Sequence, residues 1–414
     1  MSKLEKLIQQ YCPDGVECVP LSSIGTIKRG NGLQKKDFVK SGIGCIHYGQ
    51  IYTKFGLFTD KTLTYVDKEL ADHLLHIEKG DLVIACTSEN IEDVCKAVAW
   101  LGDDSIVTGG HSCVLHHNQN PKYIAYFFQT ESFQRQKRKY AYGTKVIDIK
   151  PDSIGKIEIP VPPLPVQEEI VRVLDAFTEL QAELQAELQK RQQQYNFYRD
   201  NLLNFKNINR GGQEIKWMKL KDVATQWYRG AGIKREEVGN EGMPCIRYGE
   251  IHTSYNIWFK DCISHTDETK QATKKYAEYG DILFAITSED IPLVGNSVAY
   301  LGKEKIMVGG DIVVMKHNQD PRYMAYALST SDAIKQKGKG KVKSKVVHTN
   351  VPSLQEIVIP IPPMEEQQRI ADILDRFDTL TNDLTSGLPA EMEKRRQQYE
   401  FYRDKLLTFK RKEA

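Results

Sequence analysis

Apolar and aromatic residues recur at alternating intervals of four and three residues through the middle of the chain. The positions are 170, 174, 177, 181, 184, 188, 191, 195, 198, 202 and 205, and two of them, Gln181 and Arg191, are polar. This spacing is typical of a coiled-coil seam. Residues 166–206 are therefore predicted to form one helix about 60 Å long. The apolar seam residues are Ile170, Leu174, Phe177, Leu184, Leu188, Tyr195, Tyr198, Leu202 and Phe205.

A second seam with similar spacing lies near the C-terminus. Gly387-Leu388-Pro389 interrupts it, and we expect this tripeptide to kink or break the helix. The two seams are predicted to pack against each other in antiparallel orientation, because a long amphipathic helix needs a long partner. The alternative is that each helix packs on its own domain. The residues of this second seam are Ile370, Leu374, Phe377, Tyr399, Tyr402, Leu406 and Phe409.

The regions before the two seams have a different pattern. Residues 19–160 and 216–360 contain short β-type runs broken by turn residues, which indicates mostly β domains. One helix is predicted in each, at 121–129 and 321–329, with Asn120 or Asp320 as the N-cap and proline at the first helical position. A proline-rich elbow at 160–163 and 360–363 then ends the last strand before the long helix.

The whole organisation occurs twice. Residues 80–102 return at 280–302 with 12 of 23 positions identical, and His117-Asn-Gln-Asn-Pro121 returns as His317-Asn-Gln-Asp-Pro321. Two copies of this length are too few for a solenoid and indicate a tandem duplication, which can fold with a pseudo-two-fold axis. Within the first long helix, the tetrapeptide Gln-Ala-Glu-Leu occurs at 181–184 and again at 185–188. Adding or removing one copy would change the helix length by about 6 Å.

These patterns predict an α+β fold. Two mostly β domains are separated by two long antiparallel coiled-coil helices in a pseudo-two-fold tandem repeat, with the globular domains at opposite ends of a rod. The expected parts are an N-terminal helical segment (1–18), a first globular domain (19–160), a first long helix (161–210), a second globular domain (211–360) and a second long helix (361–414).

Composition narrows the class of protein. Of the 414 residues 40% are hydrophobic and 27% are charged, as in a folded chain, and the net charge of +2 excludes a uniformly basic nucleic-acid binder. No apolar run is long enough to span a membrane, and the N-terminus lacks the apolar core of a signal peptide. The eight cysteines form no CxxC pair, so we expect reduced thiols in the cytoplasm. The histidine and cysteine spacings predict no metal site.

No catalytic site can be defended from the sequence. Residues 338–344 have the wrong spacing for a phosphate-binding loop, and Gly30-Asn-Gly32 lacks the third glycine of a dinucleotide-binding turn. Asn120-Pro-Lys-Tyr123 is similar to an adenine-methyltransferase loop, but Lys122 replaces its second proline. Pro151-Asp152 with Glu158 suggests a nuclease triad whose lysine is missing, since Pro160 occupies that place. We therefore expect no catalytic residue.

Positive charge is concentrated at one equivalent place in each globular domain. Residues 134–150 hold six Lys and Arg residues against Asp148 alone, and residues 333–345 hold six lysines and no acid. Because the whole chain is only slightly basic, the rest of it carries a net negative charge. Basic, flexible loops of this kind are suited to phosphate contacts, although they could also be solubilising loops.

Weaker candidates lie in other repeated segments. Thr87-Ser-Glu-Asn90 and its counterpart at 287–290 offer short polar side chains that could read base edges, although ordinary turn chemistry explains them equally well. The candidate DNA-binding residues are Lys28, Arg29, Lys35, Lys36, Tyr48, Ser88, Asn90, Arg135, Lys137, Arg138, Lys139, Tyr142, Lys145, Arg229, Lys234, Arg235, Arg247, Tyr248, Ser288, Lys335, Lys337, Lys339, Lys341, Lys343 and Lys345.

Taken together and in order, the motifs resemble the specificity subunit of Type I restriction–modification enzymes over nearly the whole chain. Those that carry the resemblance are Ile159-Pro-Val-Pro-Pro-Leu164 with Gln167 and Ile170, Ile359-Pro-Ile-Pro-Pro-Met364 with Gln367 and Ile370, and Gly387-Leu-Pro-Ala390 followed by Arg396-Gln-Gln-Tyr-Glu-Phe-Tyr402. The resemblance implies that the globular domains are target recognition domains, each binding one half of a bipartite site in double-stranded DNA. The two halves here resemble each other more than the family leads us to expect, which leaves open whether the half-sites are related.

The resemblance also implies a set of partners. The helices would set the gap between the half-sites and dock two methyltransferase subunits, which bind S-adenosylmethionine and modify adenine at N6. Two restriction subunits, which are translocases with a nuclease, would complete the assembly, so that ATP and Mg²⁺ are likewise expected on partners and no cofactor on this chain. Two other hypotheses remain at this point: a self-contained DNA enzyme, and a protein-interaction scaffold without DNA binding.

Overall fold

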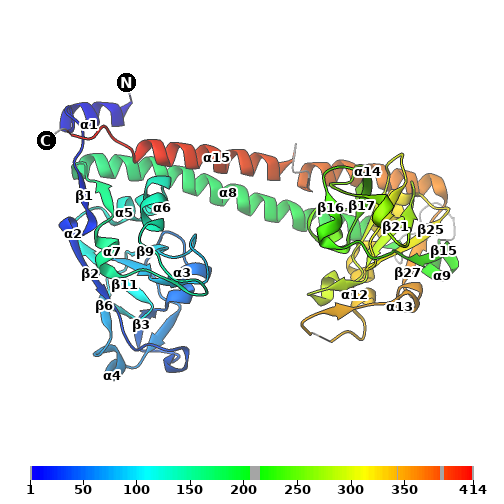
Figure 1. Ribbon diagram of the computed structural model, residues 1–414, viewed down its shortest axis with the longest axis horizontal. Coiled ribbons are helices and arrows are strands. Elements are labelled where there is room, and N and C mark those ends of the chain that lie inside the picture. The colour runs from blue at the N-terminus through cyan, green and yellow to red at the C-terminus, as the bar shows by residue number, and fades with distance from the viewer. Residues whose placement is uncertain (1, 206–214, 343, 383–386, 413–414) are drawn as a thin grey trace. The chain divides into compact units, whose positions relative to one another are not determined.

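The computed structural model describes residues 2–205, 215–342, 344–382 and 387–412. The chain divides into two compact units (Figure 1). Unit 1 comprises Met1–Glu183 with Glu393–Ala414, and unit 2 comprises Leu184–Met392. Each unit therefore takes one helical segment from the other copy of the repeat.

Unit 1 is built on a five-stranded and a four-stranded sheet. The five-stranded sheet has the order β2-β11-β7-β9-β4 and is antiparallel except where β4 pairs with β9. Its strands are β2 (Gly25–Arg29), β11 (Ser112–His117), β7 (Leu82–Ala85), β9 (Ala97–Trp100) and β4 (Phe58–Thr59). The four-stranded sheet has the order β5 (Thr64–Val66), β3 (Ile43–Ile46), β10 (Ile106–Thr108) and β6 (Leu75–Ile77).

The sequence of β7 explains why it is central. All four residues of this strand are buried, so both faces of the sheet are covered. Leu82 and Ile84 belong to one hydrophobic cluster, and the alternate residues Val83 and Ala85 belong to another. Successive side chains of a strand point to opposite faces, so a continuous apolar run can serve both cores at once.

Two short ladders complete the strands of unit 1. Strand β1 (Cys18–Pro20) pairs with β13 (Glu158–Pro160), and β8 (Thr87–Ser88) pairs with β12 (Ile147–Asp148). The helices are α1 (Lys3–Tyr11), α2 (Leu21–Ile24), the 3-10 turn η1 (Lys35–Asp37), α3 (Tyr48–Thr53), α4 (Lys68–Ala71), α5 (Pro121–Phe127), α6 (Glu131–Arg138), α7 (Pro151–Gly155) and the first part of α8 (Leu164–Leu202).

Unit 2 repeats this architecture. Its five-stranded sheets have the orders β15-β25-β21-β23-β18 and β16-β19-β17-β24-β20, and β14 pairs with β27 and β22 with β26. The strands are β14 (Lys216–Lys219), β15 (Ala224–Arg229), β16 (Val238–Gly239), β17 (Met243–Ile246), β18 (Trp258–Phe259), β19 (Ser264–Thr266), β20 (Tyr276–Ala277), β21 (Ile282–Ala285), β22 (Thr287–Ser288), β23 (Ser297–Tyr300), β24 (Ile306–Val308), β25 (Ile312–His317), β26 (Val347–His348) and β27 (Val358–Ile361). The helical elements are α9 (Leu220–Val223), η3 (Arg235–Glu237), α10 (Tyr248–Thr253), η4 (Glu268–Lys270), η5 (Ile291–Leu293), α11 (Pro321–Leu328), α12 (Ser331–Gly338), α13 (Val351–Gln355), α14 (Met364–Asn382) and α15 (Leu388–Leu406).

The predicted capped helices are confirmed. The Asn120 side chain accepts hydrogen bonds from the backbone of residues 122 and 123 at the start of α5, and Asp320 does the same for α11. Proline lies at the start of both helices. A cap of this kind satisfies backbone donors that have no partner inside the helix.

The proline elbow is fixed by the same polar contacts in both units. The Tyr123 hydroxyl donates to the Pro160 carbonyl (2.9 Å), and the Gln167 side chain joins the Asn120 amide to the Pro162 carbonyl. Tyr323 and Gln367 make the equivalent contacts in unit 2. The elbow therefore holds the long helix against the globular domain in a defined direction.

The long helices confirm the antiparallel seam and, in part, the alternative. In unit 1 the rings of Phe177 and Tyr402 stack 5.7 Å apart, and in unit 2 those of Tyr198 and Phe377 stack 5.9 Å apart. A hollow in unit 2 is lined by residues of both helical segments, namely Glu187, Arg191, Gln194 and Tyr195 with Phe377, Thr381 and Leu388. Ile170 and Leu174, by contrast, are buried in the core of their own unit. Each helix start therefore packs on its own domain as well as on the other copy's helix.

The remaining seam residues differ in burial. Leu188, Tyr195, Ile370, Leu374 and Tyr399 are buried. Those that are half-buried or more exposed are Phe177, Leu184, Tyr198, Leu202, Phe377, Tyr402 and Leu406. The predicted break is seen as two helices, since α14 ends at Asn382 and α15 begins at Leu388, with Pro389 in its first turn. Residues 383–386 lie outside the described residues.

The prediction of reduced thiols is confirmed for six of the eight cysteines, which are free. It is wrong for Cys86 and Cys113, which the structure joins in a disulfide. Cys86 directly follows β7, and Cys113 lies on the neighbouring strand β11, so the sheet brings two residues 27 positions apart into contact. Among the described residues, no helix is long and apolar enough to cross a membrane.

Candidate nucleic-acid interface

Strand β8 and the residues that follow it lie at the centre of the candidate site in unit 1. Residues 87–95 are called the recognition segment below, and residues 287–295 are its counterpart in unit 2. The Tyr52 hydroxyl of α3 donates to the Thr87 carbonyl, and the Thr87 hydroxyl is 2.9 Å from Nδ1 of His111. The ring of Tyr48 lies 4.7 Å from that of His111. Helix α3, strand β8 and the turn at 109–111 therefore meet at one place, where Tyr48 and Ser88 are both partly exposed.

Arg29 of β2 stabilises this site through Asp148 of β12, the strand that pairs with β8. Its guanidinium donates two hydrogen bonds to the Asp148 carboxylate (3.0 and 2.7 Å), and its Nε donates to the Gly110 carbonyl. The Tyr142 hydroxyl also donates to Asp148. The hydrogen bonds to Asp148 raise the pKa of Arg29. Because its charge is already neutralised, Arg29 is suited to hold the site together rather than to bind a phosphate.

Unit 2 keeps the same network with two residues exchanged. Position 311, equivalent to His111, is Asp311, and position 348, equivalent to Asp148, is His348. The Thr287 hydroxyl accordingly lies 3.2 Å from His348, and Arg229 pairs with Asp311 (2.8 Å). Both units thus retain a threonine–histidine contact and an arginine–aspartate pair, although the partners come from different elements.

Only the first part of each basic stretch is helical, whereas loops were predicted throughout. Helix α6 ends at Arg138 and α12 at Gly338, and the rest of each stretch follows the helix. Lys137 and Lys337 face the interior, with 1% and 5% of their surfaces exposed. DNA binding by these two lysines stays a prediction, and their burial does not support a direct phosphate contact. The residues of these stretches that are exposed are Arg135, Arg138, Lys139, Tyr142, Lys145, Lys335, Lys339 and Lys345; Lys341 is half-buried, and Lys343 lies outside the described residues.

The short polar candidates differ between the units. Ser288 is 3% exposed, and its hydroxyl accepts the amide hydrogen of Asp290, as the Ser88 hydroxyl accepts that of Asn90, which supports the turn-chemistry interpretation; base contact by Ser288 stays a prediction. Ser88 is half-buried. Asn90 is exposed, and its amide group hydrogen-bonds Asp93.

The other cationic candidates lie on several elements. Lys28 is exposed next to Arg29 on β2, and its side chain points to the opposite face of the strand. Lys35 lies close enough to His47 to influence its pKa. Burial lowers the pKa of His47 most, and the positive charges of Lys35 and His111 lower it further. Those that are exposed are Lys28, Lys35, Lys36, Arg229, Lys234, Arg235 and Tyr248; Arg247 is half-buried.

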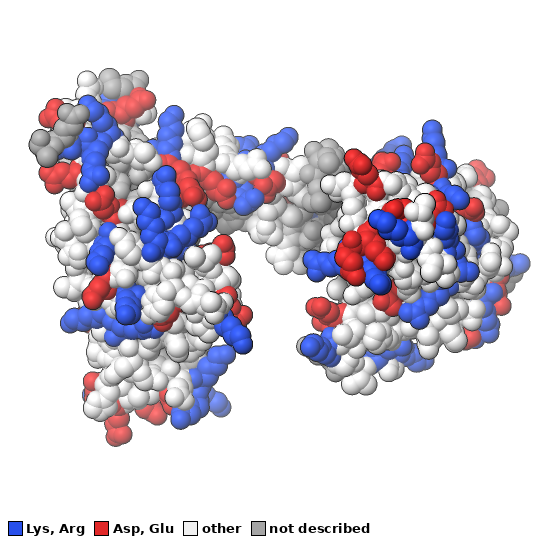
Figure 2. All heavy atoms as spheres, viewed as in Figure 1, with Lys and Arg blue, Asp and Glu red and all other residues white. Residues whose placement is uncertain are grey.

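Lysine and arginine side chains gather in patches on each unit, with acidic side chains between them (Figure 2). This distribution agrees with the nearly equal numbers of basic and acidic residues in the chain. The cationic side chains form local patches. A surface of this kind can bind DNA phosphates over a limited area without attracting every polyanion.

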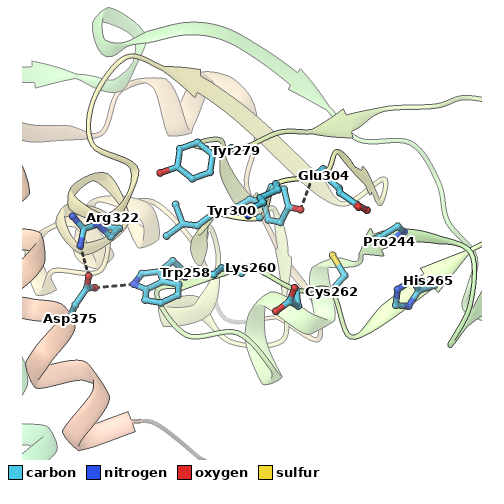
Figure 3. Close-up of a pocket in the computed structure, with 14 residues that line it drawn as sticks. Pro244, Trp258, Lys260, Cys262, His265, Tyr279, Tyr300, Glu304, Arg322 and Asp375 are labelled. Carbon is cyan, nitrogen blue, oxygen red and sulfur yellow. Dashed lines mark hydrogen bonds and ion pairs between the residues drawn. The ribbon is translucent and has the colours of Figure 1, made fainter.

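Unit 2 also has a cavity of about 820 Å³ that contains none of the candidate residues. At one end of it Asp375 of α14 accepts hydrogen bonds from the indole of Trp258 and from Arg322 (Figure 3). Asp375 also accepts the Tyr326 hydroxyl, as Asp175 accepts that of Tyr126 in unit 1. These hydrogen bonds attach α14 to the globular domain of unit 2. This end of the cavity is therefore part of the contact between that helix and the domain.

Comparisons with known proteins identify the family. The sequence profile described as "Type I restriction modification DNA specificity domain" matches residues 13–191 and 213–394. The chain belongs to this family. The specificity subunit of the Type I restriction enzyme EcoR124I/EcoR124II of Escherichia coli is 33% identical over 430 residues, which cover 100% of this chain and 98% of that protein. A putative Type I specificity subunit of Mycoplasma pneumoniae is 30% identical over 309 residues, covering 72% of this chain and 84% of the relative.

The fold has a counterpart among solved structures. A chain from a study of complex assembly and conformational transition of the Type I R-M system superimposes with a TM-score of 0.65 at 15% identity, over 96% of this chain and 98% of that chain. The family match and the Escherichia coli relative, rather than this likeness of fold, show that the chain is a Type I specificity subunit, a non-catalytic class of subunit that recognises DNA sequence. Among the described residues, no cluster of three or more His, Cys, Asp and Glu could hold a metal ion.

Sequence reasoning missed several residues of this candidate site. The hydrogen-bond networks of the two units include Tyr52, His111, Asp148, Asp311 and His348, and none was a candidate. A signal was present: at an offset of 200 the two copies exchange histidine and aspartate between positions 111 and 148. An exchange of this kind indicates two residues that share one network.

Proposed function

We propose that each unit of this specificity subunit reads one half of a bipartite site in double-stranded DNA. The observation that carries this proposal is that the two units share one framework, down to the elbow hydrogen bonds, while the residues around the recognition segment differ. A shared framework can place both segments against DNA in the same way. Different side chains, such as His47 against Arg247, can then read different bases.

The DNA-contacting set follows from exposure and position. We propose Lys35, Tyr48, Asn90, Lys139 and Lys145 in unit 1, supported by the exposed cations of α6. The equivalent proposal in unit 2 is Lys234, Arg235, Arg247, Tyr248, Lys335, Lys339 and Lys345. Arg29 and Arg229, each paired with an aspartate, would act mainly by holding the site together.

We further propose that the long helices set the separation of the half-sites and dock two methyltransferase subunits. Helix α8 is continuous over 39 residues and enters both units, which supports a role as a spacer. The methyltransferase subunits would bind S-adenosylmethionine and modify adenine at N6. Two restriction subunits would join through them, bringing ATP and Mg²⁺. This assembly would work on DNA in the cytoplasm.

The domain boundaries stay a proposal. Residues 1–18, 19–160, 161–210, 211–360 and 361–414 are proposed as the N-terminal segment, first recognition domain, first helix, second recognition domain and second helix. The pairing of β1 with β13 and of β14 with β27 supports the limits near 19, 160, 216 and 360, because each pair joins the two ends of one domain. The limit at 210–211 lies outside the described residues.

The test is single-molecule methylation sequencing of the host genome with and without this gene. We expect loss of N6-methyladenine at one bipartite motif on deletion, and its return when the gene is restored. Replacing residues 19–158 with another recognition domain should change one half of the motif. A restored strain that expresses the chain and its methyltransferase but methylates no bipartite motif would contradict the proposal.

A further inference from the structure

Each unit buries one lysine of its basic helix. Lys137 of α6 and Lys337 of α12 are equivalent at the offset of 200, and both are almost fully buried. Burial lowers the pKa of both ammonium groups. Removing a cation from water is costly unless it gains hydrogen bonds. A methionine would fill a similar volume without the free-energy cost of burying an ammonium group. Because both copies nevertheless have lysine, the hydrogen bonds that its Nζ donates are the feature to examine.

In unit 1 the donors of Lys137 reach the recognition segment. Nζ of Lys137 donates to the Glu92 carbonyl at 2.9 Å. Glu92 lies between β8 and β9, in the stretch that carries Asn90. The same stretch contains hydrogen bonds between Asn90 and Asp93 and turns through Cys95, whose φ is 65°. Lys137 therefore joins the segment to α6.

In unit 2 Lys337 holds the end of the equivalent segment. Its Nζ donates to the Ser297 hydroxyl (3.2 Å) and to the Leu328 carbonyl (2.9 Å). Ser297 is the first residue of β23, where the segment returns to the sheet. The aliphatic part of Lys337 lies against Gly295, whose added Cβ would be 3.5 Å from Cγ and Cδ of the lysine.

We propose that Lys137 and Lys337 are positioning residues for sequence recognition: each fixes the segment that follows β8 or β22, the strand whose Thr87 or Thr287 belongs to the candidate site. This inference rests on the proposed function. It also reassigns two lysines that charge counting would place on the DNA backbone. A buried lysine of this kind contributes to base discrimination without touching a phosphate.

Salt dependence separates the two roles. A lysine that contacts a phosphate releases a counterion on binding. Its loss lowers the salt slope, by which we mean the magnitude of the decrease of log K with log salt, by about 0.9. A positioning lysine leaves the slope unchanged. Lys139 and Lys339 are matched controls, because they are exposed and follow α6 and α12 at equivalent positions.

The experiment uses the full chain bound to its methyltransferase subunits. The probes are a duplex with the intact bipartite motif and two duplexes with one half-site altered. Lys137→Met is expected to reduce discrimination at the half-site of unit 1 about tenfold and to spare the other, and Lys337→Met to do the reverse. Both should keep the wild-type salt slope. Lys139→Met and Lys339→Met should lower the slope and keep discrimination.

Hydrogen exchange shows whether the effect is local. In Lys137→Met we expect faster exchange at residues 89–95 while the amides of β7 and β9 stay protected. Unchanged discrimination, a lowered salt slope, or loss of protection throughout unit 1 would each overturn the inference. If the wild-type complex itself shows no sequence discrimination, the proposed function fails first, and the two failures are thereby distinguished.

Discussion

A buried ammonium group couples the stability of unit 2 to pH. Burial lowers the pKa of Lys337 to about 7, whereas in the unfolded chain a lysine keeps its proton to about pH 10.4. Between these values the unfolded state binds more protons than the folded state. The free energy of unfolding should therefore rise with pH over this range, up to tenfold in the unfolding constant per pH unit.

The prediction is checked by urea unfolding of wild type and Lys337→Met at pH 7, 8 and 9. We expect the wild-type unfolding constant to fall with pH more steeply than that of the variant, while other titrating groups contribute equally to both. Lys339→Met, in which an exposed lysine is lost, should behave as wild type. Parallel curves for wild type and Lys337→Met would contradict the prediction.

At the scale of single residues, charge could be counted from the sequence but burial could not. Charge counting located the two basic stretches, whose first parts lie in α6 and α12. It missed the burial of Lys137, although the same helix face carries Phe133, four residues earlier, and Phe133 is fully buried. Ala333 and Lys337 repeat this spacing. Residues four apart lie on one helix face, so the apolar member of each pair was the available signal.

At the scale of elements, the exchange of aspartate and histidine between positions 111 and 148 offers a test of the network. Asp148→His alone removes the carboxylate that Arg29 pairs with. His111→Asp alone removes the histidine beside Thr87. Each single change should destabilise unit 1 by about 1 kcal/mol, since the lost hydrogen bonds are partly exposed.

The double variant, His111→Asp with Asp148→His, should recover most of this loss. It recreates in unit 1 the arrangement of Asp311 and His348 in unit 2. The measurement is a double-mutant cycle of urea unfolding at one fixed pH. Additive effects of the two single changes would show that the positions do not form one network.

The larger elements were predictable because their signals are local. The capped helices, the proline elbow and the four-three seam each depend on residues within a few positions of one another. The β8–β12 ladder was not predictable, because it pairs two-residue strands about 60 positions apart in sequence and no local pattern marks them. The centre of the candidate site depends on that ladder, which is why its residues were found incompletely.

At the scale of the whole molecule, the Gln-Ala-Glu-Leu repeat at 181–188 spans the boundary between the two units at residues 183 and 184. One further copy after Leu188 would lengthen α8 by about 6 Å and rotate the rest of the helix by about 40°. We expect the gap between the half-sites to grow by about one or two base pairs while both half-sites stay the same.

Methylation sequencing of a strain carrying the insertion measures this directly. The control variant reverses the order of residues 185–188 without changing the length of α8, and it should methylate the original motif. An insertion variant that keeps the original gap would show that α8 does not set the separation. Altered half-sites would show that the recognition domains are not independent of the helix.

The exchange of helical segments between the repeat copies has a consequence for synthesis. The core of unit 1 includes Tyr399 and Leu407, more than 200 residues beyond the point where its own first helical segment ends. At ribosomal rates of about 5–20 residues per second, that core waits on the order of ten seconds or more for its last side chains. Unit 2, whose parts are contiguous, can close earlier. The first domain to be translated is thus the last to be finished, and a nonsense codon late in the gene would impair the half of the protein made first.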